Sequence, residues 1–226
     1  MKYLILIVTI FCTIDCFSQE RTVGIIDAGN NLTNGNLQMY TKKGADPMVE
    51  GSSSLFDEFR AGSVVFTDGT TSEDVILNCD YYIGTLYITY EEQEFFVDIN
   101  LVESFSVKAD HRDARHFVVH AIADKPVLFE VLNNGKTFDL LQSYQCRKIR
   151  PSYNPVLQSG SKNFRLETRS KFYVREGQRV VELPRSRRKL KKMDDIDRKL
   201  ISEMVKNKVD LKSADDLVEF FETYNT

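Results

Sequence analysis

Tryptophan is absent from the 226 residues, and histidine and cysteine occur only three and four times. The sequence also contains no Walker loop, no GxGxxG dinucleotide loop, no GxSxG nucleophile elbow and no HExxH zinc helix. It therefore lacks the motifs by which common nucleotide-binding proteins, α/β-hydrolases and zinc proteases are recognised. We assign no catalytic residue on this basis and expect no cofactor.

Long apolar runs are also missing, apart from one short run near the N-terminus. Leu4 to Cys12 follows the cationic start Met1 to Tyr3, and no charge interrupts the run before Asp15. A helix of this length is too short to cross a hydrocarbon layer of about 30 Å. It has the length of the apolar region of a secretion signal.

Small side chains at Cys16 and Ser18 favour cleavage of that signal before Gln19. An uncleaved anchor would need a longer apolar span. A lipoprotein would need a small residue before the lipidated cysteine, whereas Asp15 precedes Cys16. We expect residues 1–18 to be a signal peptide, and the mature chain to be exported, periplasmic or extracellular, soluble and without a transmembrane span.

The net charge of −3 is small, but the charges are unevenly distributed. Residues 46–103 hold thirteen acidic residues and one basic residue, whereas residues 144–192 hold fifteen basic and three acidic residues. Three interpretations fit this pattern. The two charged regions attract each other as faces of one fold, or the basic face docks a polyanion, or the chains associate head to tail. The near-neutral total gives no reason to expect specific nucleic-acid binding.

The densest basic run is the candidate polyanion site, although such runs also form solvated faces or protease-sensitive junctions. Its members are Arg185, Arg187, Arg188, Lys189, Lys191 and Lys192. We expect this run to begin a helix and to lie on the acidic half of the fold, because cations oppose the dipole at a helix start unless carboxylates offset them.

The residues from 19 to 183 show turn chemistry first and strand patterns later. Residues 19–54 are rich in Gly, Asn, Ser and Thr and are predicted to be a loosely structured segment. Residues 55–183 contain short predicted strands, among them residues 85–90, 102–107, 163–167 and 171–175. Their connections are too short for crossover helices, which favours an antiparallel meander, sandwich- or roll-like. Asp68-Gly69 and Asn134-Gly135 are hairpin-turn signals, and Pro151 to Gly160 is predicted to be a long loop.

Residues 184–226 change to the apolar period of helices. They are predicted to form an α-helical hairpin packed on the β domain, with Ser186 and Ser213 as N-caps. The fold class expected is therefore mainly β with a C-terminal α-helical hairpin. The apolar positions that support it are Leu190, Met193, Ile196, Leu200, Met204, Leu217, Phe220, Phe221 and Tyr224.

Two cysteines, Cys79 and Cys146, remain after signal cleavage. An oxidising compartment permits a disulfide between them, and burial as free thiols is the alternative. They lack the CxxC spacing of zinc or redox sites. His116 and His120 would lie about 13 Å apart on a strand, too far to share one ion, so no metal site is expected; His111 precedes them.

Four tyrosines cluster in one predicted hairpin and are candidate ligand-binding residues, because exposed tyrosines stack on sugars. Aromatic residues also favour strands for packing alone. The four are Tyr81, Tyr82, Tyr87 and Tyr90.

A resemblance rests on three stretches: the strand, Asp-Gly turn and strand pattern from Gly62 to Phe105, the run Phe129 to Leu141, and the closing run Asp216 to Asn225. Together they resemble a loose group of small exported bacterial proteins of unknown function, with a strand-rich domain before a basic helical segment. The resemblance implies no catalytic residue.

These patterns predict a non-enzymatic binding or structural protein of the bacterial envelope, whose partner is another envelope protein or a polyanion or glycan. The alternative is an exported hydrolase with an unrecognised carboxylate or His site.

The export hypothesis predicts cleavage between Ser18 and Gln19. Intact-mass measurement of protein recovered from the periplasm or medium should give the mass of residues 19–226. A mass that retains residues 1–18 would contradict the prediction.

Overall fold

The structure, a computed structural model, describes residues 25–26, 32–33, 37–39, 49–90, 93–108, 114–154 and 156–225. The three segments before residue 49, together with residue 90 and residues 93–95, are described by their backbone alone. The predicted signal peptide and most of the predicted loosely structured segment lie outside the described residues.

The described chain is mainly β, as predicted, and ends in short helices. Most strands belong to one mixed sheet of twelve. The strands are β1 Ile25–Ile26, β2 Leu32–Thr33, β3 Leu37–Met39, β4 Val49–Glu50, β5 Arg60–Phe66, β6 Thr71–Asp80, β7 Thr85–Tyr90, β8 Gln93–Val97, β9 Val102–Val107, β10 Arg115–Ile122, β11 Lys125–Asn133, β12 Asp139–Ile149, β13 Phe164–Glu176 and β14 Arg179–Glu182.

The strand order departs from a simple meander in three places. β9 returns to pair with β5 and β3 pairs with β8, so the order is β14-β13-β12-β11-β10-β9-β5-β6-β7-β8-β3. β4 pairs with β13 in parallel. In a flat sheet β8 and β9 would be about 19 Å apart. The connection of residues 98–101 is too short for that span, because three of its residues form a 3₁₀ turn. The sheet therefore curls, bringing β8 near β9.

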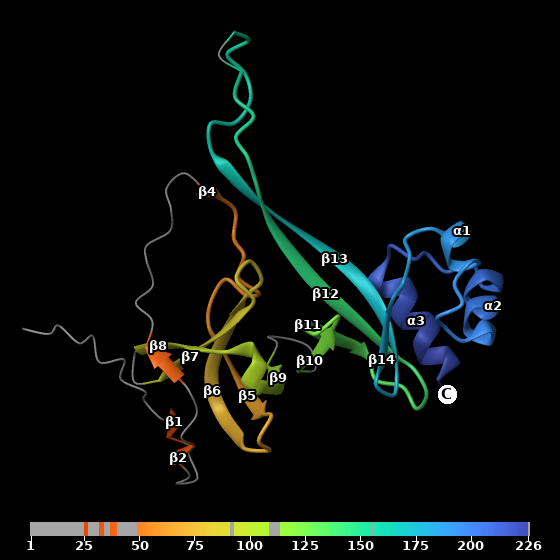
Figure 1. The fold of residues 1–226 in the computed structure, drawn as a ribbon, viewed down its shortest axis with the longest axis horizontal. Coiled ribbons are helices and arrows are strands. Elements are labelled where there is room, and N and C mark those ends of the chain that lie inside the picture. The colour runs from red at the N-terminus through yellow and green to blue at the C-terminus, as the bar shows by residue number, and fades with distance from the viewer. Residues whose placement is uncertain are drawn as a thin grey trace, which may run out of the picture.

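The described residues form three apolar cores. The curled strands β5 to β10 enclose one core, which includes Val64, Leu77, Leu86 and Phe105. The C-terminal helices pack a second core against β12 and β13, and a small third core around Phe129 lies between β11, β12 and β13. Figure 1 shows the helices gathered at one end of the long hairpin that β12 and β13 form.

That hairpin is longer than the sequence pattern suggested. The two strands predicted at 163–167 and 171–175 are one continuous strand, β13, and β12 runs on to Ile149. The eleven residue pairs from Asp139↔Arg175 to Ile149↔Arg165 are uninterrupted. Polar residues fill the middle of both strands, so no apolar period marked their full length.

The two predicted hairpin turns differ in outcome. Asp68-Gly69 does join β5 to β6, with Gly69 at φ +83° and the Asp68 carboxylate accepting the Thr70 N–H at 2.8 Å. Gly135 instead lies in a longer loop, where its N–H donates to Asp139 (3.0 Å). Any Cβ on Gly135 would collide with the Asn225 side chain at 2.1 Å. Gly135 is thus needed for close approach of the C-terminus.

The C-terminal segment forms three helices instead of the two expected: α1 Arg187–Leu190, α2 Arg198–Lys206 and α3 Ala214–Tyr224. The predicted first helix is interrupted because Asp197 caps α2, accepting N–H groups of Lys199 (2.6 Å) and Leu200 (3.0 Å). Ser186 makes no side-chain cap, whereas Ser213 caps α3 as predicted.

A buried charged cluster joins strands β10, β11 and β12. Arg115 binds Glu130 through two hydrogen bonds of 2.6 and 2.7 Å, and the Tyr144 hydroxyl donates to the same carboxylate at 2.6 Å. The Glu130 side chain is only 9 % exposed. Tyr81, which follows β6, stacks on Tyr144 with ring centroids 4.7 Å apart. The end of β6 is thereby attached to the middle of β12.

This cluster predicts a graded set of stability losses. Glu130→Gln should lower the free energy of unfolding by about 3–5 kcal/mol, because it leaves the Arg115 charge partly buried without its counter-ion. Tyr144→Phe should cost about 1.5–3 kcal/mol, the typical worth of one hydrogen bond to an ionised group. Urea denaturation measures both.

Asp195→Asn is the matched control, since it removes an exposed ion pair with Arg179 (2.9 Å) and should cost at most about 1 kcal/mol. Equal losses for Glu130→Gln and Asp195→Asn would contradict the role assigned to the cluster.

Candidate anion-binding groove

The register of β12 and β13 places cations together on one face of the hairpin. Arg147 lies opposite Glu167, and Gln145 lies opposite Arg169. Residues directly opposite each other in an antiparallel pair project from the same face. Lys171, two residues beyond Arg169, projects from that face as well.

Next to this face, the chain that leaves β14 closes a groove of about 800 Å³. Apolar side chains line part of it, among them Phe172, Leu183 and Met193. Five cations and a single carboxylate, Glu182, also line it. The cations are Arg147, Arg169, Lys171, Arg185 and Lys189.

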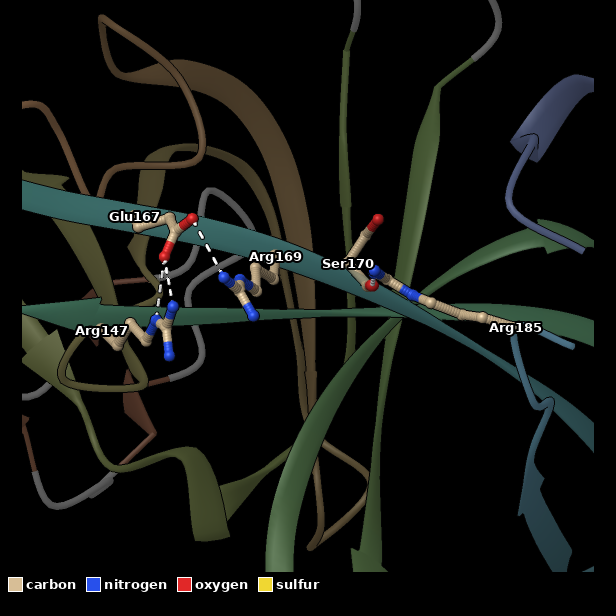
Figure 2. Close-up of polar contacts among 5 residues, drawn as sticks. All are labelled: Arg147, Glu167, Arg169, Ser170 and Arg185. Atoms are coloured by element: carbon tan, nitrogen blue, oxygen red, sulfur yellow. Dashed lines mark hydrogen bonds and ion pairs between the residues drawn. The ribbon is translucent and has the colours of Figure 1, made fainter.

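Two of these arginines share one carboxylate just outside the groove. Arg147 donates to Glu167 through Nε at 2.9 Å and Nη2 at 2.6 Å, and Arg169 donates to its other oxygen at 3.2 Å (Figure 2). The hydrogen bond from Arg147, and to a lesser extent that from Arg169, lowers the pKa of Glu167. One carboxylate cannot neutralise two guanidinium groups, so this side of the groove keeps a positive charge.

The remaining cations are held differently. Lys171 pairs with Glu182 at 2.8 Å, and this hydrogen bond raises the pKa of Lys171. Arg185 donates to the backbone carbonyl of Ser170 at 2.6 Å (Figure 2), which fixes the side chain without neutralising it. Lys189 forms no ion pair within the described residues. The groove therefore presents uncompensated positive charge.

The six predicted basic residues divide between several environments. Arg185 and Lys189 line the groove. Arg187 donates to the carbonyls of Lys208 and Val209, where it supports the turn after α2. The other three are exposed and do not line the groove; they are Arg188, Lys191 and Lys192.

The expectation that this basic run lies on the acidic half of the fold is wrong. The run packs beside β13 and β14, and none of its six cations pairs with a carboxylate in the part of the chain that the structure describes. The groove cations on β12 and β13 were not singled out from the sequence. Strand register could have found them, since it brings Arg147 and Arg169 beside Glu167.

The tyrosine candidates do not form one binding surface. Tyr81 turns inward against Tyr144, and burial raises the pKa of its hydroxyl. Tyr82 is 49 % exposed on the turn after β6, and Tyr87 is half-buried on β7. The Tyr90 side chain lies outside the described part of the chain.

Cys79 and Cys146 are both free thiols, so the possible disulfide is not formed. Cys79 is buried in the core of the curled strands, and burial raises its thiol pKa to about 12. Cys146 is half-buried on β12 and lines the groove. The two thiols therefore lie in different surroundings, Cys79 in the core of the curled strands and Cys146 at the groove.

His116 and His120 lie on a strand, β10, as predicted, but His120 is not simply exposed. Arg175 donates to Nε2 of His120 at 2.8 Å and to the Asp139 carboxylate at 2.6 Å. His116 is exposed, and His111 lies outside the described residues. Among the described residues no three His, Cys, Asp or Glu side chains are grouped to hold a metal.

Comparisons with protein families, characterised proteins and solved structures found no match to this chain. Among the described residues, every helix is too short or too polar to cross a membrane. The functional interpretation therefore rests on the geometry of the groove and its charges.

The His120 contacts predict a pH dependence of stability. Burial, and then the Arg175 charge, lower the pKa of His120, whereas Asp139 opposes the shift. The unfolded state therefore takes up the proton first, and stability is full above the unfolded pKa of about 6.5 and falls as the pH drops through it. Melting temperatures measured between about pH 7.5 and 5.5 should fall less for His120→Gln than for the native protein.

His116→Gln, on the same strand but exposed, should keep the native profile. Identical pH profiles for the native protein and His120→Gln would contradict the prediction.

Proposed function

We propose that this chain is an exported, non-enzymatic binding protein of the bacterial envelope, and that its groove holds an anionic polymer such as an acidic glycan. The observation that carries the proposal is the ratio of five lining cations to one lining carboxylate. A solvated face with no ligand would gain nothing from holding like charges together around one depression.

The spread of the cations favours a polymer over a small anion. They come from β12, from β13 and from the segment after β14. An exposed charge pair is worth about 0–1 kcal/mol, so useful affinity requires several pairs at once. A ligand with repeated negative charges can contact all of these elements, and its binding should weaken as salt screens the charges.

The apolar part of the lining favours a ligand with hydrocarbon surface between its charges. Phe172, Leu183 and Met193 line the groove together with the cations. Sugar rings present such surface, which supports an acidic glycan over an inorganic polymer.

No observation favours the hydrolase alternative. Glu167 and Glu182 are each paired with basic side chains. Arg175 stands between Asp139 and His120, so the carboxylate does not orient the imidazole as a base. Among the described residues, these contacts support the proposal of a charge-holding role over a catalytic one.

The test uses heparin as a polyanionic probe. The double variant Arg169→Gln/Lys189→Gln removes one cation from each side of the groove and should elute from immobilised heparin at lower salt, with an affinity at least about tenfold weaker. That estimate assumes about 1 kcal/mol for each lost charge pair.

The matched control is Lys136→Gln/Lys212→Gln, which loses the same charge at exposed sites outside the groove. Equal weakening of both double variants would show that only net charge matters and would reject the groove as the site.

A further inference from the structure

The β12–β13 hairpin continues beyond the rest of the molecule as an arm. Figure 1 shows the two strands running away from the helices, with β4 beside them only part of the way. Every described residue from 151 to 160 is exposed. Strand pairing continues as far as Ile149 and Arg165. Beyond it, the Ser152 N–H donates to the Ser161 carbonyl at 3.0 Å and connects the two sides of the arm near its tip.

The described residues of the tip hold apolar side chains outward. Asn154 and Ser159 form an isolated β-bridge, and the Asn154 side chain accepts the N–H groups of Val156 (2.9 Å) and Leu157 (3.2 Å). Val156 is 87 % exposed and Leu157 is 71 % exposed. Two adjacent apolar side chains thus stand at the outermost point of the chain's longest hairpin.

Basic residues flank this tip on both strands and form what we call the collar. Its members are the four basic residues of 148–166, Lys148, Arg150, Lys162 and Arg165, and this range contains no acidic residue. Lys162 lies over the Tyr153 ring at 4.7 Å, and Lys148 lies over the Phe164 ring at 4.4 Å. Glu50, on β4 at the base of the arm, accepts a hydrogen bond from Asn163 at 3.0 Å and offsets part of this charge.

We propose that the arm is a membrane-docking element whose tip enters the interface of an anionic lipid bilayer. Val156 and Leu157 enter the acyl boundary, Tyr153 lies at the headgroup level as interfacial aromatic residues do, and the collar binds lipid phosphates. This surface is separate from the groove, so the proposal does not depend on the proposed function.

The shape of the tip favours a bilayer over a protein partner. A stable protein interface buries about 800 Å² on each side, and a single turn with two apolar side chains offers far less. A bilayer needs no matching pocket, because its interface receives small apolar insertions wherever charge holds the protein close. The order along the arm, apolar tip first and cations behind it, matches the order of layers in a lipid leaflet.

The first test measures cosedimentation with vesicles of phosphatidylcholine alone or mixed with phosphatidylglycerol. The protein should bind the mixed vesicles and not the neutral ones, and high salt should release it. Val156→Ser/Leu157→Ser should weaken binding at least about tenfold, from the lost apolar burial. Arg150→Gln/Lys162→Gln/Arg165→Gln should weaken it by about fivefold for each charge.

Two matched controls locate the effect. Tyr82→Ser/Ile83→Ser removes exposed apolar surface, 49 % and 54 % exposed, from the turn between β6 and β7, and should bind as the native protein does. The groove variant Arg169→Gln/Lys189→Gln should also keep nearly all of its vesicle binding, although it loses heparin affinity if the proposed function holds.

The second test exploits the absence of tryptophan. Leu157→Trp places a single reporter at the tip, and Ile83→Trp places one on the other turn. On mixed vesicles the emission of Leu157→Trp should shift to the blue and be quenched by brominated acyl chains, and that of Ile83→Trp should not change.

Four results would overturn the proposal. Equal binding to neutral and mixed vesicles would remove the role of charge. Equal loss in the tip variant and the Tyr82→Ser/Ile83→Ser control, or loss in the groove variant alone, would place the contact elsewhere. No binding to either vesicle, with unchanged Leu157→Trp emission, would leave a protein partner as the occupant of the tip.

Discussion

The uninterrupted pairing of β12 with β13 is the constraint on which the other parts depend. Its eleven residue pairs form one strongly twisted hairpin. One end carries the helical core through Leu140, Phe172 and Val174. The middle carries the cationic face, and the far end continues into the arm. Because a slip by one residue would move every side chain to the other face, this register decides the helical core and the groove together.

The buried cluster around Glu130 attaches the curled strands β5 to β10 to this hairpin. Apolar packing is non-directional and would tolerate several orientations. The Glu130 carboxylate accepts hydrogen bonds from Arg115 on β10 and from Tyr144 on β12. Such directional bonds tolerate far fewer relative orientations of the strands. The Tyr81–Tyr144 stack then attaches the end of β6 to the same point. The charged cluster adds orientation to a core that already supplies the apolar burial.

Much of this architecture could be predicted from local patterns, and the departures have physical causes. Period-two segments predicted β7 and β9 at their observed bounds, and Ser213 predicted the start of α3. Long-range pairing was not visible: β13 was predicted as two strands because Thr168 and Ser170 break its apolar pattern. Gly135 was assigned to a tight hairpin because sequence does not show that Asn225 would pack against it. Only two of the six predicted basic residues line the groove. The other three groove cations come from β12 and β13, and the pairing of these two strands could not be read from the sequence.

The charge asymmetry of the chain has a different meaning in the fold than in the sequence. Opposite charges separated along a chain can pair within one fold. Here the basic strand β12 pairs with the basic strand β13, and the basic half of the chain, residues 144–192, holds only three acidic residues. Like charges brought together destabilise a fold through self-repulsion, and Glu167, Glu182 and Asp139 offset only part of it. The cost is smaller where the cations keep contact with water, as Arg147 and Arg169 do with side chains 55 % and 53 % exposed. A surface built at such a cost is best explained by an anionic partner that completes the neutralisation.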